Sequence, residues 1–176
     1  MDKLYRQEKC AMSRWLCVVA ILLTYLSSFI MSSCSSIDCP VQNIVSVQYE
    51  IRDKAGTALS ITDSLSVISE RLDGQYVSLN RLIDKSAFSL PISYSHPEDV
   101  LFFCFSNSDT ILVDTVWIKK DDIPHFESVD CSAAFFHELK DVRHTHNAID
   151  SLVLVNPSVT YDVETIHFYL YPKTGD

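Results

Sequence analysis

Glycine is scarce in this chain. Of 176 residues only Gly56, Gly74 and Gly175 are glycine. Loops that cradle phosphate groups need closely spaced glycines, and the nucleophile elbow of α/β-hydrolases needs the pattern Gly-x-Ser-x-Gly. The sequence contains neither motif, which argues against a nucleotide-dependent enzyme or a hydrolase of that type. We therefore expect a non-enzymatic protein that uses no cofactor.

Basic residues are also few. The chain has 14 Lys and Arg residues against 23 Asp and Glu residues, for a formal net charge of −9. A protein that binds nucleic acid needs a basic patch to neutralise phosphates. We therefore exclude nucleic acid as a partner, and we interpret the acidity as a means of keeping a displayed protein soluble.

Amphipathic stretches of helical period are short, none exceeding about three turns, and we find no internal repeat or low-complexity segment. The sequence after residue 43 instead alternates between apolar and polar residues with a period of two, as half-buried strands do. This pattern predicts an all-β, immunoglobulin-like antiparallel sandwich of about seven to nine strands. We expect it to form a single domain over residues 44–172, followed by a tail of residues 173–176.

Turn signals divide the predicted domain into strands. The run Val100–Phe105 is apolar on both faces, which predicts a central strand. Lys119–Pro124 breaks the pattern and predicts a solvated connection, whereas Ala133–His137 fits either a helical turn or a short strand. The other expected strands are Ile44–Arg52, Ser64–Arg71, Tyr76–Leu79, Ser86–Ile92, Thr110–Ile118, Ala148–Val155 and Glu164–Tyr171.

The N-terminus has the layout of an export signal. Basic residues precede an apolar run, Trp15–Ile30, as the n-region and h-region of a signal peptide do. As a helix the run would reach roughly 24 Å, short of a hydrocarbon core of about 30 Å. The alternative is an uncleaved anchor that borrows Met31 and neighbouring serines.

The residues that follow the apolar run, Met31-Ser32-Ser33-Cys34, are similar to a bacterial lipobox. This similarity predicts a signal peptide over residues 1–33, acylation of Cys34, and a tether over residues 34–43. Two or more acyl chains hold a protein stably in a membrane. The residues after Cys34, Ser35 and Ser36, are typical of lipoproteins of the outer membrane, facing either the periplasm or the cell surface. An ordinary signal peptide ending at Ser32 or Ser33 is the other interpretation.

The predicted export determines how we interpret the remaining cysteines. Cys104 lies in an apolar run and is expected to be a small buried hydrophobic residue. Cys39 and Cys131 lie beside polar residues at predicted strand edges, and an exported protein is in an oxidising compartment. We predict a Cys39–Cys131 disulfide, which would contribute about 4 kcal/mol if it is unstrained.

Several short patterns, spread over most of the exported chain, resemble a family of small Bacteroidetes lipoproteins of unknown function. They are Cys39-Pro40, Phe88–Ile92, Cys131 before Phe135-Phe136, Asn147–Leu152 and Ile166–Tyr169. The chain departs from the family pattern at Ser132, where glycine is expected. The resemblance implies a lipid-anchored β-sandwich and assigns no catalytic residue.

Histidines suggest an alternative, enzymatic function. His144-Thr145-His146 would place two imidazoles on one strand face, with His125 or His137 as further ligands for zinc or copper. Such a site would suit a small metal-dependent or hydrolytic envelope enzyme. The other interpretation is a histidine pair in a surface loop.

Two further patterns bear on binding. Acidic pairs such as Asp121-Asp122 and Glu98-Asp99 lie in predicted turns, where either calcium binding or simple solvation accounts for them. Tyr169 and Tyr171 lie with His167 on the strand face opposite Phe168. We expect His167 to face solvent. These tyrosines would dock a glycan ring or another envelope protein, unless a second sheet or a neighbouring strand covers them.

Overall fold

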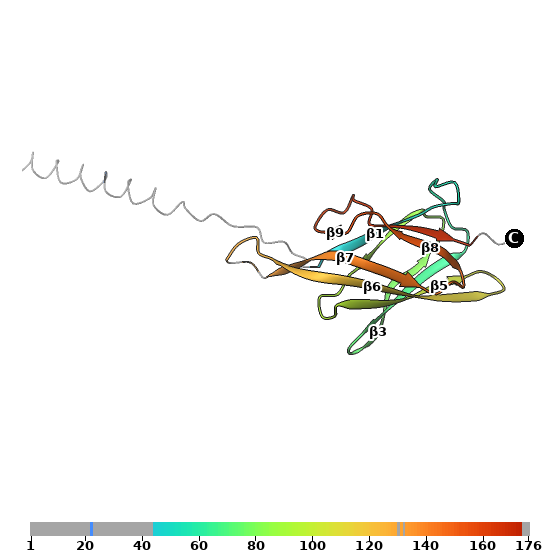
Figure 1. Ribbon diagram of the computed structural model, residues 1–176, viewed down its shortest axis with the longest axis horizontal. Coiled ribbons are helices and arrows are strands. Elements are labelled where there is room, and N and C mark those ends of the chain that lie inside the picture. Colours follow the sequence, from blue (N-terminus) through green and yellow to red (C-terminus); the bar gives the residue numbers. More distant parts are fainter. Residues whose placement is uncertain (1–21, 23–43, 130, 132, 174–176) are drawn as a thin grey trace, which may run out of the picture. The chain divides into compact units, whose positions relative to one another are not determined.

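The described part of the chain is built from ten β-strands (Figure 1). The computed structural model describes residues 44–129, 131 and 133–173, together with Leu22. The strands are β1 (Ser46–Ile51), β2 (Ser64–Arg71), β3 (Gly74–Leu82), β4 (Ala87–Pro91), β5 (Glu98–Ser106), β6 (Ile111–His125), β7 (Ala134–His144), β8 (Ile149–Leu154), β9 (Ser158–Val159) and β10 (Phe168–Pro172). All of them belong to the second of two compact units, Cys39–Asp176.

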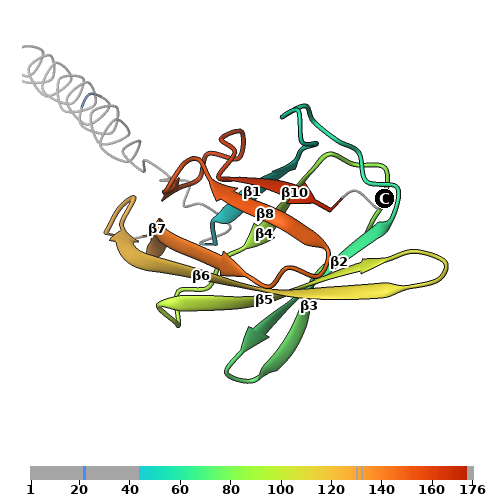
Figure 2. The same cartoon turned by 45° about the vertical axis from the view of Figure 1, so that its right-hand side comes forward.

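The strands form two sheets that pack face to face. One sheet has the order β4-β1-β10-β8 and the other has the order β3-β2-β5-β6-β7-β9. Figure 2 shows β1, β8 and β10 in one layer and β5 and β6 in the other. The predicted sandwich is confirmed, with ten strands instead of seven to nine and with one parallel pair, β1 and β10.

The core lies between the inward faces of the two sheets. Tyr49 on β1 stacks between Phe88 on β4 and Phe168 on β10, with ring centroids 4.8 and 5.3 Å apart. Phe103 on β5 reaches across from the other sheet and meets the Tyr49 ring edge-on at 6.0 Å. The strand β5 is central, between β2 and β6, as its apolar sequence predicts. Burying the Tyr49 side chain raises the pKa of its hydroxyl.

Two sequence expectations are corrected in β6 and β7. The predicted connection over Lys119–Pro124 is wrong, because β6 continues through it to His125. The ambiguous segment at Ala133 proves to be the approach to a strand, since β7 runs from Ala134 to His144 beside β6. The alternation that directs Val116 and Ile118 inward continues to Lys120, which is also buried.

The sandwich has two ends of different composition. We call the end where β1 begins proximal: there the backbone of Val45 accepts a hydrogen bond from the N–H of Ile92. The distal end is where the parallel strands β1 and β10 finish, at Ile51 and Pro172. Among the described residues, no helix combines the length and apolar character that crossing a bilayer requires. Apart from Leu22, the predicted signal peptide lies outside the described residues, as does Cys34.

Candidate functional site

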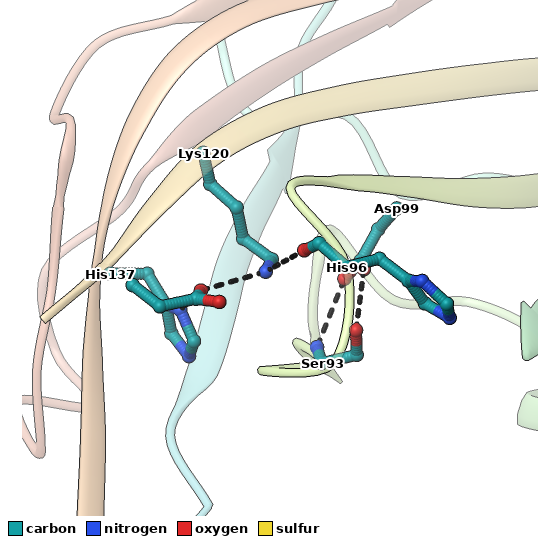
Figure 3. A network of polar contacts seen from close by, with 6 residues as sticks. Ser93, His96, Asp99, Lys120 and His137 are labelled. Atoms are coloured by element: carbon teal, nitrogen blue, oxygen red, sulfur yellow. Dashed lines mark hydrogen bonds and ion pairs between the residues drawn. The ribbon is translucent and has the colours of Figure 1, made fainter. Parts of the chain in front are cut away.

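Polar side chains are buried at both ends of the sandwich, where the chain passes from one sheet to the other. At the proximal end, Lys120 Nζ donates to Asp122 Oδ1 at 2.8 Å and to the carbonyl oxygen of His96 at 2.7 Å (Figure 3). His137 Nδ1 lies 2.7 Å from the same Asp122 oxygen. The Lys120 side chain is fully enclosed, whereas that of Asp122 is 24% exposed.

The charge state of this network follows from burial. Desolvation lowers the pKa of His137, although its hydrogen bond to Asp122 opposes that shift. A neutral His137 donates its Nδ1 proton to the Asp122 carboxylate, and the Lys120 ammonium balances the carboxylate charge. The three side chains together are then neutral, which is the arrangement that a buried group of ionisable residues requires.

The network fastens the loop between β4 and β5. Asp99 accepts hydrogen bonds from the backbone N–H and the hydroxyl of Ser93, at 3.0 and 2.8 Å, while Lys120 holds the carbonyl of His96. Lys120 and His137 are only 1% and 2% exposed, so a substrate has no access to their side chains. We interpret the network as support for this loop and not as a catalytic centre.

At the distal end, Asp114 fastens the connection between β7 and β8. Its Oδ1 accepts from Thr145 Oγ1 at 2.6 Å and from the N–H of Asn147 at 2.7 Å. Its Oδ2 accepts from the N–H groups of Ala148 and Ile149, at 2.6 and 2.7 Å. Desolvation alone would raise the pKa of Asp114, but these hydrogen bonds outweigh it and hold the pKa below its usual value.

The expectation that His167 faces solvent is wrong, since the residue is 1% exposed. It precedes β10, so the alternation of that strand does not govern its direction. Its Nδ1 accepts the N–H of Gln48 at 3.0 Å, and its Nε2 lies 3.1 Å from the carbonyl oxygen of Ser158. These contacts require a neutral ring with the proton on Nε2, and burial lowers the pKa of His167 accordingly.

A groove lies at the distal end of the sandwich. It consists of two adjoining hollows of about 820 and 550 Å³ that share Thr62, Asp63 and Asn107. We call it the distal groove. Its other lining residues are Leu59, Ser60, Ile61, Ser64, Ser66, Arg81, Ile83, Cys104, Phe105, Ser106, Ser108, Thr110, Ile111, Leu112, Asn147, Ala148, Pro172 and Lys173.

The chemistry of the distal groove is mixed. Hydroxyl and amide side chains alternate with aliphatic ones, and the charged residues Asp63, Arg81 and Lys173 include both signs. Arg81 has a φ of 50°, in the left-handed region that residues other than glycine seldom adopt. Its N–H donates to Ser66 Oγ at 3.1 Å. Sequence reasoning missed this groove because its residues come from five separate segments that only the fold brings together.

The two tyrosines chosen from the sequence lie on the outer face of the four-stranded sheet and are half-buried. Tyr169 pairs with Glu50 and Val153 on the adjacent strands. The Arg52 guanidinium covers it, with its central carbon 3.5 Å from the ring centroid. A cation, and not a second sheet, is therefore what covers Tyr169. Neither Tyr169 nor Tyr171 lines the distal groove.

His144 and His146 do come together, with ring centroids 4.3 Å apart. His144 Nδ1 lies 2.7 Å from the carbonyl oxygen of Thr145, so this nitrogen carries a proton and is not available to a metal. His137 lies seven residues earlier on the same strand, roughly 23 Å away, and His125 pairs with Glu127 beyond it. Within the described residues, no group of three or more His, Cys, Asp or Glu side chains is arranged to hold a metal.

The structure describes Cys104 and Cys131 but not Cys34 or Cys39. Cys104 is a free cysteine of intermediate exposure that lines the distal groove, so it is less buried than expected. Desolvation raises the pKa of its thiol. Cys34 and Cys39 lie outside the described residues, so acylation and the Cys39–Cys131 pairing stay predictions.

The chain was compared with known families and proteins. A model described as a family of unknown function, DUF6452, matches residues 64–172, which is more than half of the chain. No curated protein matches the chain, and no solved structure matches it.

Proposed function

We propose a function for this chain on the premise that it belongs to the DUF6452 family of unknown function. We propose that it is a lipid-anchored protein of the bacterial outer membrane that acts by binding, not by catalysis, and that the distal groove is its binding site. The lipobox at Cys34 and the export signal before it support the anchor. A Cys39–Cys131 disulfide would secure the tether to the loop between β6 and β7.

One observation carries this proposal: the distal groove lies at the opposite end of the sandwich from Ile44, the first described residue of the domain. A tether that leaves from the proximal end would hold the groove away from the membrane. The lining favours an uncharged ligand that bears hydroxyl or amide groups, such as a glycan or an exposed peptide, because its polar side chains are mainly Ser, Thr and Asn.

Metabolic labelling with an alkyne fatty acid tests the anchor. We expect the wild-type protein to take up the label and to sediment with membranes, and the Cys34→Ser variant to do neither. The Cys39→Ser variant is a matched control that keeps the acylation site. Equal labelling of the wild type and Cys34→Ser would contradict the proposal.

A further inference from the structure

Large apolar side chains are exposed at the proximal end of the sandwich. Tyr94 in the loop between β4 and β5 is 61% exposed, and Phe126 and Val129 in the loop between β6 and β7 are 67% and 99% exposed. Ile123 on β6 and Ile44 before β1 are 47% and 57% exposed. We call these five residues the proximal tip.

Described contacts bring the loops of the proximal tip together. The ring of Tyr94 stacks on that of Phe135 at a centroid distance of 5.1 Å, which joins the loop after β4 to the start of β7. Next to it, the backbone of Ile92 bonds to that of Val45, beside the point where the chain continues toward its N-terminus. The tip therefore lies at the end of the sandwich where the described domain begins.

The loop that carries Tyr94 is held in place. Asp99 and Lys120 fasten its backbone through Ser93 and His96, and Lys120 also donates its backbone N–H to the carbonyl of Pro97 at 2.9 Å. Phe135 covers one face of the Tyr94 ring, and the rest of the ring is held toward solvent on a fastened loop. This is the arrangement expected of a preformed contact surface.

We propose that the proximal tip rests in the interfacial layer of the membrane that holds the anchor. This inference rests on the proposed acylation of Cys34. Ile44 follows Cys34 by ten residues, so an extended tether reaches about 35 Å at most, and the proposed disulfide from Cys39 to the β6–β7 loop would shorten that reach. Amphipathic aromatic side chains such as tyrosine favour the headgroup region of a bilayer.

The charges near the tip define how it binds. His125 Nε2 lies 2.9 Å from Glu127 Oε1, and the chain is acidic as a whole. Anionic lipid therefore gives the tip no electrostatic attraction, and its contact with the membrane is apolar. A contact of this kind depends on the high effective concentration that a covalent anchor provides. The tip should orient an anchored domain and should not recruit one that lacks the anchor.

Site-specific tryptophan fluorescence tests the inference. The background is Trp117→Phe, because Trp117 is the tryptophan that remains after removal of the leader with Trp15. Phe126→Trp reports on the tip, and Ile111→Trp, at a residue that is 70% exposed in the distal groove, is the matched control. The full chain is purified from membranes in its acylated form. It is reconstituted into vesicles of phosphatidylethanolamine and phosphatidylglycerol, with or without brominated phosphatidylcholine.

We expect the acylated protein to float with the vesicles and the brominated lipid to quench most of the emission of the Phe126→Trp variant, while the Ile111→Trp variant is unaffected. Flotation with no quenching at residue 126, or with equal quenching at both residues, would overturn the inference and leave the anchor intact. A wild-type protein that carries no lipid and does not float would overturn the anchor, and the inference with it.

Discussion

Asp114 is the buried residue on which the distal end depends most. Its two carboxylate oxygens accept one hydroxyl and three backbone N–H groups, so the residue closes the β7–β8 connection that contributes Asn147 and Ala148 to the distal groove. A buried N–H that loses its acceptor costs about 1 to 3 kcal/mol. The stability of the domain and the shape of the groove are therefore linked through a single side chain.

We expect Asp114→Asn to lower the free energy of unfolding by about 2 to 4 kcal/mol, because the new NH2 group replaces one oxygen and, in either orientation, faces at least one backbone N–H donor. Urea denaturation of the domain measures this loss. Asp150→Asn, at an exposed carboxylate nearby, is the control and should change stability by less than about 0.5 kcal/mol. Equal effects of the two substitutions would contradict the assigned role of Asp114.

Histidine burial predicts a dependence of stability on pH. The folded-state pKa values of His137 and His167 are lowered, mainly by desolvation, so the unfolded chain binds protons more readily than the folded domain. Stability should therefore be full above about pH 6.5 and decline as the pH falls below that value. Removing His167 removes part of this dependence.

Thermal denaturation between pH 5 and 8 measures this dependence of stability on pH, with His167→Gln compared against the wild type. We expect the variant to be less stable at pH 8 and to lose less stability than the wild type as the pH falls. His146→Gln is the control, because His146 is exposed and should leave the wild-type slope unchanged. Parallel curves for His167→Gln and the wild type would refute the assignment of a neutral buried ring.

Among the elements, β6 differs most from its predicted form. Its proximal half carries Lys120 and Asp122 on the inward side. Hydrogen bonds permit this: Lys120 donates to the carbonyl of His96, and Asp122 accepts from His137. Removing one member of a buried ion pair leaves the other charge without compensation. The proximal half of β6 should therefore be sensitive to loss of either charge.

We expect Asp122→Asn to destabilise the domain by about 3 kcal/mol, because the Lys120 ammonium stays buried without its carboxylate. Asp121→Asn is the neighbouring control. The Asp121 side chain is 70% exposed and meets Lys140 at 3.4 Å, and a surface pair of this kind contributes at most about 1 kcal/mol. Denaturant unfolding measures the free energy of unfolding of both variants. A larger loss for Asp121→Asn than for Asp122→Asn would contradict the assigned role of Asp122.

The same elements show how far sequence reasoning reaches. Alternation with a period of two was sufficient to place β1 and β4, because their inward residues are apolar, and apolar content placed β2 and β5. It failed past Lys119, since a lysine and two aspartates indicate solvent when considered locally, and the compensating groups lie 15 to 24 residues away in sequence. Asp114 and Lys120 occupy the same alternating positions as the inward-facing Val116 and Ile118. This alternation was the signal in the sequence that Asp114 and Lys120 would be buried.

At the scale of the whole molecule, the two ends of the sandwich differ in character. The proximal end presents exposed apolar side chains around the start of β1, and the distal end presents the distal groove. The distal groove is built from segments between residues 59 and 173, so a local motif could not have indicated it. A single domain with one end for the membrane and one end for a ligand is the organisation we propose.

Cys104 offers a native reporter of the distal groove. Because burial raises the pKa of its thiol, alkylation should be slow at neutral pH and should accelerate about tenfold per pH unit as the thiolate fraction rises. We expect alkylation in isolated envelopes to be slower than in the purified protein if a ligand occupies the groove. Cys104→Ser controls for labelling elsewhere, and equal rates in both preparations would argue against an occupied groove.

The mass of the intact protein purified from membranes tests the central claim most directly. We predict a chain that begins at Cys34 and is heavier than its amino-acid sequence by a diacylglyceryl group and an amide-linked acyl chain. A chain that begins at Met1, or one that lacks the leader but carries no lipid on Cys34, would contradict the account.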